Sequence, residues 1–194
     1  MKKMKGNESL TKENSSKYYV ASGESSYNLG CDLMDKIADV VDKRNIVFVC
    51  IGSDRATGDC LGPLVGSKLI ESTAGGYSVY GTLENPVHAK NLEATMKNIS
   101  DSFENPFIIA IDASLGRQES IGCVGLHDFP LRPGVGVGKD LPWVGDLSIT
   151  GVVNLSGLFD EMLLQTTRLN IVMNLANCIC DGIEHCFKPS QSKS

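Results

Sequence analysis

The chain has 194 residues, of which 42% are hydrophobic and 21% are charged. This balance is typical of one globular domain with a sizeable core and excludes a disordered chain. A formal net charge of −5 argues against a general nucleic-acid or anionic-membrane binder, which would need a basic surface. No apolar run approaches the roughly 20 residues of a membrane span, and no signal peptide is visible. We therefore expect a cytoplasmic protein that binds neither membranes nor nucleic acids.

Three regions differ in composition. Residues 1–28 are polar, so we expect a flexible N-terminal arm with at most a short ordered piece near Tyr18. Residues 29–187 alternate between apolar runs and helical patterns, which predicts a single α/β domain. Residues 188–194 are polar again and are expected to fray. The seven cysteines are odd in number and several have apolar neighbours, which favours buried free thiols over disulfides or a zinc site.

In chain order, the pattern of apolar residues predicts a helix over 29–41, a strand over 46–51, a helix that starts near Pro63 and a strand over 77–83. A helix over 91–99, strands over 107–111, 121–129 and 147–153, and helices over 158–164 and 169–187 follow. The last two helices are apolar enough to cover a face of a sheet. Strands without polar alternation are buried on both faces, as in parallel sheets. We expect a three-layer sandwich with a mainly parallel five-stranded sheet.

Two aspartates follow the first and third predicted strands. Asp59 lies in the polar turn after 46–51, together with Asp54, and Asp112 ends the strand over 107–111. In the common strand order 2-1-3-4-5, the switch point of the sheet lies between the first and third strands. Ligands bind in the crevice at that point, beyond the carboxyl ends of the strands. We therefore expect Asp59 and Asp112 to meet across one crevice.

Facing carboxyl groups favour acid–base chemistry, because both cannot ionise easily at close range and the pair shares a proton. Such a pair can deprotonate a water and protonate a leaving amine, as in aspartic peptidases. Two alternatives stay open: carboxylates that bind a metal with a histidine, or aspartates that only cap the helix near Pro63 and a turn. Asp54 is interpreted as a turn residue that pairs with Arg55 in solvent.

Three histidines are further candidates. His88 and His127 follow predicted strands at the same sheet edge and could reach the crevice, although a lone histidine is more often structural. His185 lies near the C-terminal end of a helix, where charge complementarity with the helix dipole explains it without function.

A glycine-rich loop follows the strand over 121–129. Gly134, Gly136 and Gly138 alternate with valines between Arg132 and Lys139. The spacing is neither that of a Walker A loop nor G-x-G-x-x-G, so phosphate binding is not favoured. The glycines allow a peptide substrate to approach the backbone closely. The two cations are candidates to bind a carboxylate or carbonyl of that substrate.

Four segments of the chain, 52–63, 81–89, 110–116 and 132–139, resemble the YyaC-type sporulation proteins. These are similar to the spore germination proteases of endospore-forming bacteria and, more distantly, to hydrogenase maturation proteases. The resemblance covers most of residues 29–187 and implies a phosphorylase/hydrolase-like α/β fold. It also implies a role for two residues. The proposed catalytic aspartates of germination proteases lie in motifs that match Asp59 and Asp112.

The resemblance leaves the metal and the substrate less defined. Maturation proteases bind nickel through two acidic residues and a histidine, and no histidine lies at a clearly equivalent place here. We therefore expect a metal-free pair and no cofactor. Germination proteases degrade small acid-soluble spore proteins and are made as zymogens, but this chain lacks the extra length that goes with zymogen activation.

The leading hypothesis is a sporulation-associated peptidase in the cytoplasm of the spore-forming cell or forespore. Asp59 and Asp112 activate a water against a protein or peptide substrate, such as a spore protein, and His88, Gly134, Gly136, Gly138 and Lys139 bind it. The rivals are a catalytically inactive binding or structural sporulation protein and a metal-dependent maturation-type protease. The apolar C-terminal helices allow a homo-oligomer.

Overall fold

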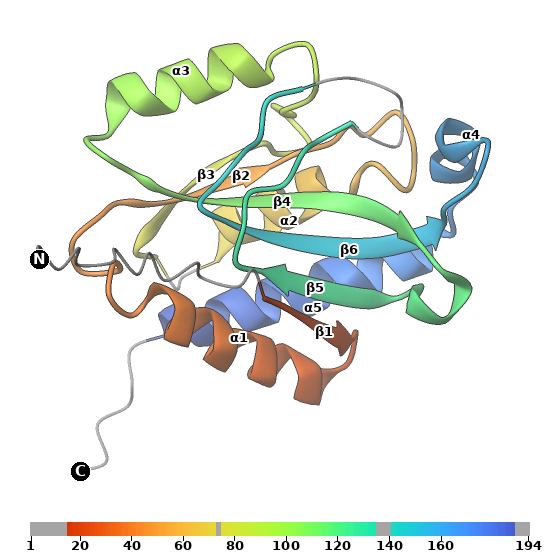
Figure 1. Ribbon diagram of the computed structural model, residues 1–194, viewed down its shortest axis with the longest axis horizontal. Coiled ribbons are helices and arrows are strands. Elements are labelled where there is room, and N and C mark those ends of the chain that lie inside the picture. Colours follow the sequence, from red (N-terminus) through yellow and green to blue (C-terminus); the bar gives the residue numbers. More distant parts are fainter. Residues whose placement is uncertain (1–14, 73–74, 135–140, 189–194) are drawn as a thin grey trace, which may run out of the picture.

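The computed structural model describes residues 15–72, 75–134 and 141–188. Strands and helices alternate along most of the chain (Figure 1). The elements are β1 (Ser16–Val20), α1 (Gly23–Ile37), β2 (Ile46–Cys50), α2 (Leu61–Glu71), β3 (Tyr77–Tyr80), α3 (Leu92–Ser102), β4 (Phe107–Gly116), a 3-10 turn (Gln118–Ser120), β5 (Cys123–His127), β6 (Leu147–Leu155), α4 (Asp160–Gln165) and α5 (Leu169–Phe187).

The strands form one six-stranded mixed sheet in the order β1-β5-β6-β4-β2-β3. Neighbours from β3 to β6 run parallel, whereas β5 is antiparallel to both β6 and β1. The α/β class is confirmed, and three of the five strand pairings are parallel. The sheet is mixed and has six strands rather than five, and the predicted order 2-1-3-4-5 is wrong. Only residues 117–122 connect β4 with β5. That link is too short for the crossover helix that a parallel pairing needs, so β5 returns antiparallel and β6 takes the place beside β4.

The sixth strand, β1, lies in the segment that was expected to be a flexible arm. It pairs with β5 from Ser16 opposite His127 to Val20 opposite Cys123. The Tyr19 hydroxyl donates a hydrogen bond of 2.5 Å to the Asp32 carboxylate of α1, which holds the strand against the helix. The ordered domain therefore begins near Ser16 rather than at residue 29. The short ordered piece that was expected near Tyr18 is this strand, although four of its five residues are exposed.

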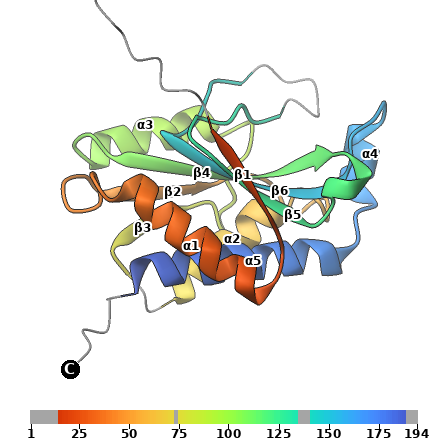
Figure 2. The ribbon, with the colours of Figure 1, turned by 60° about the horizontal axis from the view of Figure 1, so that its bottom comes forward.

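Helices cover the two faces of the sheet unequally (Figure 2). Helix α3 lies on one face, and α1, α2 and α5 lie on the other. Beneath α3, Val47 and Val49 of β2 meet Leu92 and Ile99 of the helix. Phe48, on the opposite face of β2, belongs to the larger cluster under the three helices. The predicted three-layer arrangement is thus present, with the core on both sides of β2.

Helix α4 is short and projects beyond the end of β6 in both views. Leu158 and Phe159, just before it, are 94% and 68% exposed, and Met162 within it is 59% exposed. The prediction that this apolar segment covers a sheet face is therefore wrong. Within the described part of the chain, no helix is long and apolar enough to cross a membrane.

Candidate active site

The loop after β2 brings Asp59 back to the sheet. The turn starts at Gly52, whose φ of 142° is rarely adopted by residues with a side chain. A Cβ atom at Gly52 would lie 2.0 Å from the carbonyl oxygen of Asp59. That carbonyl accepts a hydrogen bond of 3.1 Å from the Ser53 N–H, which closes the loop. The N-cap of α2 is Cys60, so Asp59 precedes the cap and is not the capping residue itself.

Asp112 lies in β4, one residue beyond the last pair of the β2–β4 ladder, Cys50 opposite Ile111. On its other side it pairs with Thr150 of β6. Strand β2 therefore ends at this level while β4 continues, which places Asp112 at the switch point between the two strands. One carboxylate oxygen accepts a hydrogen bond of 2.8 Å from the Ala113 N–H.

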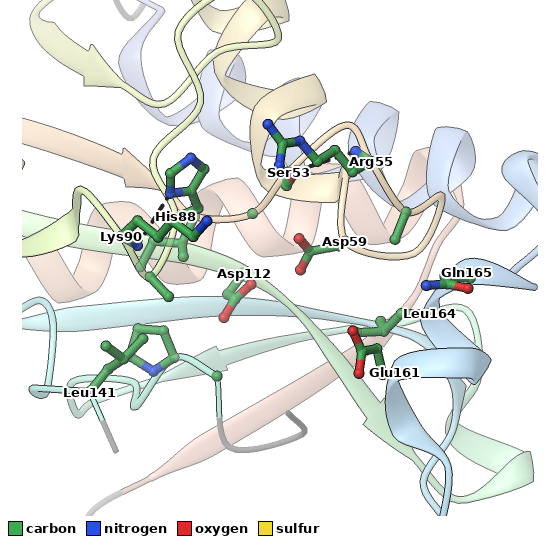
Figure 3. A pocket seen from close by; sticks show the side chains of 16 residues that line it. Ser53, Arg55, Asp59, His88, Lys90, Asp112, Leu141, Glu161, Leu164 and Gln165 are labelled. Carbon is green, nitrogen blue, oxygen red and sulfur yellow. Dashed lines mark hydrogen bonds between the residues drawn. The ribbon is translucent and has the colours of Figure 1, made fainter. Parts of the chain in front are cut away.

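The two carboxyl groups face the same space, as Figure 3 shows. Burial raises the pKa of the Asp112 carboxyl well above its ordinary value, and the nearby charge of Asp59 raises it further. The hydrogen bond from Ala113 lowers the same pKa but does not outweigh these effects. The arrangement favours a protonated Asp112 beside the Asp59 carboxyl group.

Two cavities meet at this pair. Their volumes are about 380 Å³ and about 300 Å³, and both are lined by Asp59, Asp112, Gly134 and Leu164. The first cavity also has polar side chains from three separate segments: Ser53, Arg55, His88, Lys90, Glu161 and Gln165. The second adds Ser114, Arg132, Thr150, Ser156 and Asp160. An extended ligand whose reacting bond lay at the two aspartates would have one cavity on each side of that bond.

Of the predicted substrate-binding residues, the structure brings His88 and Gly134 to the cavities. Gly136, Gly138 and Lys139 lie outside the described residues. The Nδ1 atom of His88 accepts a hydrogen bond of 3.3 Å from the Lys90 N–H, so its proton is carried on Nε2. In Figure 3 the imidazole is directed away from the two carboxyl groups. His88 is thus a rim residue.

The other two histidines have structural surroundings. His127 is buried, and its ring nitrogens lie 2.9 Å from the hydroxyls of Ser16 and Thr150. It joins β1 to β5 and β6 and lines neither cavity, and burial lowers its pKa. His185 stacks on Tyr27 with ring centroids 4.3 Å apart. The expectation that His127 could reach the crevice is therefore wrong, since its hydrogen bonds hold it inside the sheet.

Several cavity residues were not predicted. Lys90, Glu161 and Gln165 come from the segment before α3 and from α4, and no local motif marks them as site residues. Arg55 also lines the first cavity, and among the described ion pairs it has none with Asp54. The interpretation of Asp54 and Arg55 as a solvent pair is therefore wrong. The fold of the loop after β2 brings Arg55 to the cavity, and the local sequence of the loop does not predict that fold.

The donor set does not fit the nickel site of the maturation proteases. Over residues 15–72, 75–134 and 141–188, no group of three or more His, Cys, Asp or Glu side chains could hold a metal ion. His88, in the same cavity as the aspartates, already uses Nδ1 for the Lys90 N–H.

The chain is similar to a curated protein and, more distantly, to a solved structure. The chain is 54% identical over 140 residues to "Uncharacterized protein YyaC" of Bacillus subtilis (strain 168), covering 72% of this chain and 68% of that protein. The NiFe hydrogenase maturation protease HycI from Thermococcus kodakarensis KOD1 superposes with a TM-score of 0.40 at 18% identity, covering 79% of this chain and 99% of HycI. That likeness is too distant to carry an argument, so the phosphorylase/hydrolase-like fold stays a prediction.

The expected likeness to YyaC is confirmed, whereas the links to sporulation and to germination proteases stay predictions. The family pattern extends over residues 17–182, from β1 into α5. It thus includes most of β1 as well as both aspartates. By this match the chain belongs to the family described as "Protein of unknown function (DUF1256)".

Proposed function

We propose that this protein is a peptidase in which Asp59 and Asp112 activate a water against a protein or peptide substrate. One observation carries the proposal: both aspartates line the same two cavities, and the charge of Asp59 helps to raise the pKa of Asp112. When the environments of two carboxyl groups push their pKa values apart, one group can act as an acid and the other as a base. The cavities leave room for the chain on either side of the scissile bond.

In the proposed mechanism, the ionised Asp59 accepts a proton from a water as the water oxygen attacks the peptide carbonyl carbon. Asp112, held protonated, donates a hydrogen bond to the carbonyl oxygen, where negative charge develops. When the C–N bond breaks, a carboxyl proton of the pair passes to the leaving amine. The products are a carboxylic acid and an amine, and the pair again shares one proton.

We extend the proposal to a role in sporulation, with the protein in the cytoplasm of the spore-forming cell or forespore and a spore protein as substrate. The four segments that resemble YyaC-type sporulation proteins support this role, and two of them carry Asp59 and Asp112. Deletion of the gene in a spore-former, followed by comparison of spore proteins by mass spectrometry, would test it. A protein that is cleaved in the wild type should persist intact in the deletion strain.

Replacing either carboxyl group tests the catalytic pair. Asp59→Asn and Asp112→Asn should each lower the rate of cleavage of a peptide library by at least about 100-fold, because each removes an acid or base from the reaction. Asp54→Asn, in the same loop but exposed, is the matched control and should keep the wild-type rate. Thermal unfolding should show that all three variants are folded. Full activity of folded Asp112→Asn would exclude the pair.

A further inference from the structure

One edge of the sheet is open. Strand β3 is at the end of the sheet, and among the described residues its only ladder is with β2, from Tyr77 opposite Ile46 to Tyr80 opposite Val49. Alternate residues of a strand direct their N–H and C=O groups to opposite edges. About half of the β3 backbone groups therefore point away from β2. All four residues of β3 are partly exposed, and such an edge can pair with another strand.

A groove of about 480 Å³ runs along this edge. Val79 and Tyr80 of β3 line it together with Ile70 of α2 on one side and Thr95 and Asn98 of α3 on the other. Ile70 is 61% exposed and offers an apolar contact. Among the described residues that line the groove, Glu84 is the one Asp, Glu, Lys or Arg side chain. A polar, nearly uncharged groove beside unpaired backbone groups suits a polypeptide chain better than an anion.

The side chain of Asn98 is available to such a chain. Its Oδ1 atom accepts a hydrogen bond of 3.4 Å from the Ser102 hydroxyl, and its amide N–H groups have no partner among the described residues. Asn91, one helical turn before Thr95, is occupied instead: its side chain binds the His88 N–H and the Pro86 carbonyl. Asn91 thus fixes the wall of the groove, and Asn98 offers donors to an occupant.

The groove leads to the proposed active site. After β3 the chain makes a turn and then returns beside the end of β2, where Val87 forms a parallel bridge with Ile51. The sheet edge therefore continues through Val87 to His88. His88 lines both the groove and the first cavity at the aspartates. Its Nδ1 atom accepts the hydrogen bond from the Lys90 N–H, and its Nε2–H group takes no part in that bond. A chain bound along β3 would pass His88 before it reached Asp59 and Asp112.

We propose that the protein binds an extended polypeptide segment as an added strand on β3, in the groove between α2 and α3. Main-chain hydrogen bonds to the strand edge supply affinity, and contacts with Ile70 and Asn98 supply selectivity. The identification of this segment as part of the substrate rests on the proposed function. The groove would hold a stretch of the substrate next to the cleaved bond.

Hydrogen exchange tests the added strand directly. The probe is reduced, carboxymethylated α-lactalbumin, an unfolded protein, mixed in excess with the Asp112→Asn variant so that it is not consumed. We expect exchange of amides in residues 77–81 to slow by about tenfold, because amides that enter a ladder lose contact with water. Unchanged exchange in β3 at saturating probe would overturn the proposal.

Filling the groove gives a second measurement. Asn98→Trp places a large ring in it, and Ser100→Trp places the same ring on the opposite face of α3, where Ser100 is exposed and lines no part of the groove. Fluorescence anisotropy of the labelled probe should show a Kd about tenfold higher for Asn98→Trp, equivalent to about 1.4 kcal/mol. Ser100→Trp should bind as the parent does. Equal affinity of the two variants would contradict a ligand in the groove.

The two proposals fail in different ways. If Asp59→Asn abolishes cleavage but β3 gains no protection, the peptidase stands and the added strand is excluded. If β3 gains protection but the wild-type protein cleaves nothing, the strand site stands in a binding protein and the peptidase is excluded. Protection of β3 that rises with protein concentration, without probe, would identify a second copy as the occupant and overturn the proposal.

Discussion

The Asp112 carboxyl group links the candidate chemistry to stability. Burial and the charge of Asp59 raise its pKa well above the ordinary value of 3.8. The folded protein therefore holds this proton more tightly than the unfolded chain does. The contribution to stability is fully present below the unfolded pKa and is lost as the pH rises through the raised folded pKa. A residue placed for catalysis thus lowers stability near neutral pH, as strained functional sites often do.

Asp112→Asn should remove this pH dependence. Relative to the variant, the free energy of unfolding of the wild type should fall as the pH rises above about 4, by at most about 1.4 kcal/mol per pH unit. Urea denaturation at several values between about pH 4 and about pH 8 measures the difference. The exposed Asp54→Asn variant controls for the loss of one carboxylate. Curves for wild type and Asp112→Asn that stay parallel would show that the Asp112 site does not hold its proton as described.

The unit made of β2, α2 and β3 positions the Asp59 loop through backbone contacts that leave no space for side chains. A Cβ atom at Gly66 of α2 would lie 1.9 Å from the carbonyl oxygen of Gly81. A Cβ atom at Gly81, where φ is 92°, would lie 1.9 Å from the carbonyl oxygen of Cys50. The helix therefore lies directly against the sheet just after the loop, and Asp59 is held by rigid neighbours.

Gly66→Ala should destabilise this unit. The added methyl group must displace backbone, so we expect the free energy of unfolding to fall by about 1–3 kcal/mol or more. Gly23→Ala is the matched control, because a Cβ atom at that helical glycine has nothing within 4 Å. Chemical denaturation of both variants measures the change. If Gly66→Ala were as stable as Gly23→Ala, the close approach of α2 to the sheet would be wrong.

Across the whole molecule, the burial of the cysteines shows how well the core excludes solvent. All seven are free; Cys31 and Cys123 are partly exposed and the other five are buried. Burial raises the pKa of Cys180 and of Cys186 to about 12, so their reactive thiolate forms are disfavoured. This agrees with the expectation of buried free thiols.

A thiol-labelling experiment checks this arrangement. In native protein, a disulfide reagent such as DTNB should modify Cys31 and Cys123 first, and the other five cysteines should react only when urea unfolds the chain. Mass spectrometry of the modified peptides identifies the order, and the unfolded protein should take up seven labels. Fast labelling of Cys50 or Cys180 in native protein would contradict the packing of the core. Fewer than seven labels after unfolding would indicate a disulfide.

Long, uninterrupted patterns were predicted well from the sequence. Strand β2 was expected over 46–51 and is found at Ile46–Cys50, and α5 begins and ends at the predicted residues, Leu169 and Phe187. Such elements bury most of their apolar positions, so the pattern of apolar residues reveals them. For β1, only a short ordered piece near Tyr18 was expected, because most of the strand is exposed. Helix α4 was expected to cover a face of the sheet and does not, because Met162 and the preceding Leu158 and Phe159 are exposed.

For the candidate site, local sequence placed Asp59 and Asp112 after two buried strands, and the rule that sites lie at a switch point paired them. The pairing of Asp59 with Asp112 depended only on β2 and β4 being parallel neighbours, and the observed sheet has this arrangement. The same reasoning failed for His127, which also ends a strand but pairs with Ser16 and Thr150 inside the sheet. A position at a strand end does not tell which face or cavity a side chain enters.

The amino-acid sequence alone specified the α/β class, the buried strands and the two acidic residues, because these depend on periodicity and on neighbours along the chain. The folded structure was needed for the antiparallel edge of β5 and β1, for Arg55 and Lys90 in the cavity, and for the open groove along β3. These features arise from contacts between segments far apart in the chain. Their free energies depend on which surfaces meet, and no local pattern encodes that.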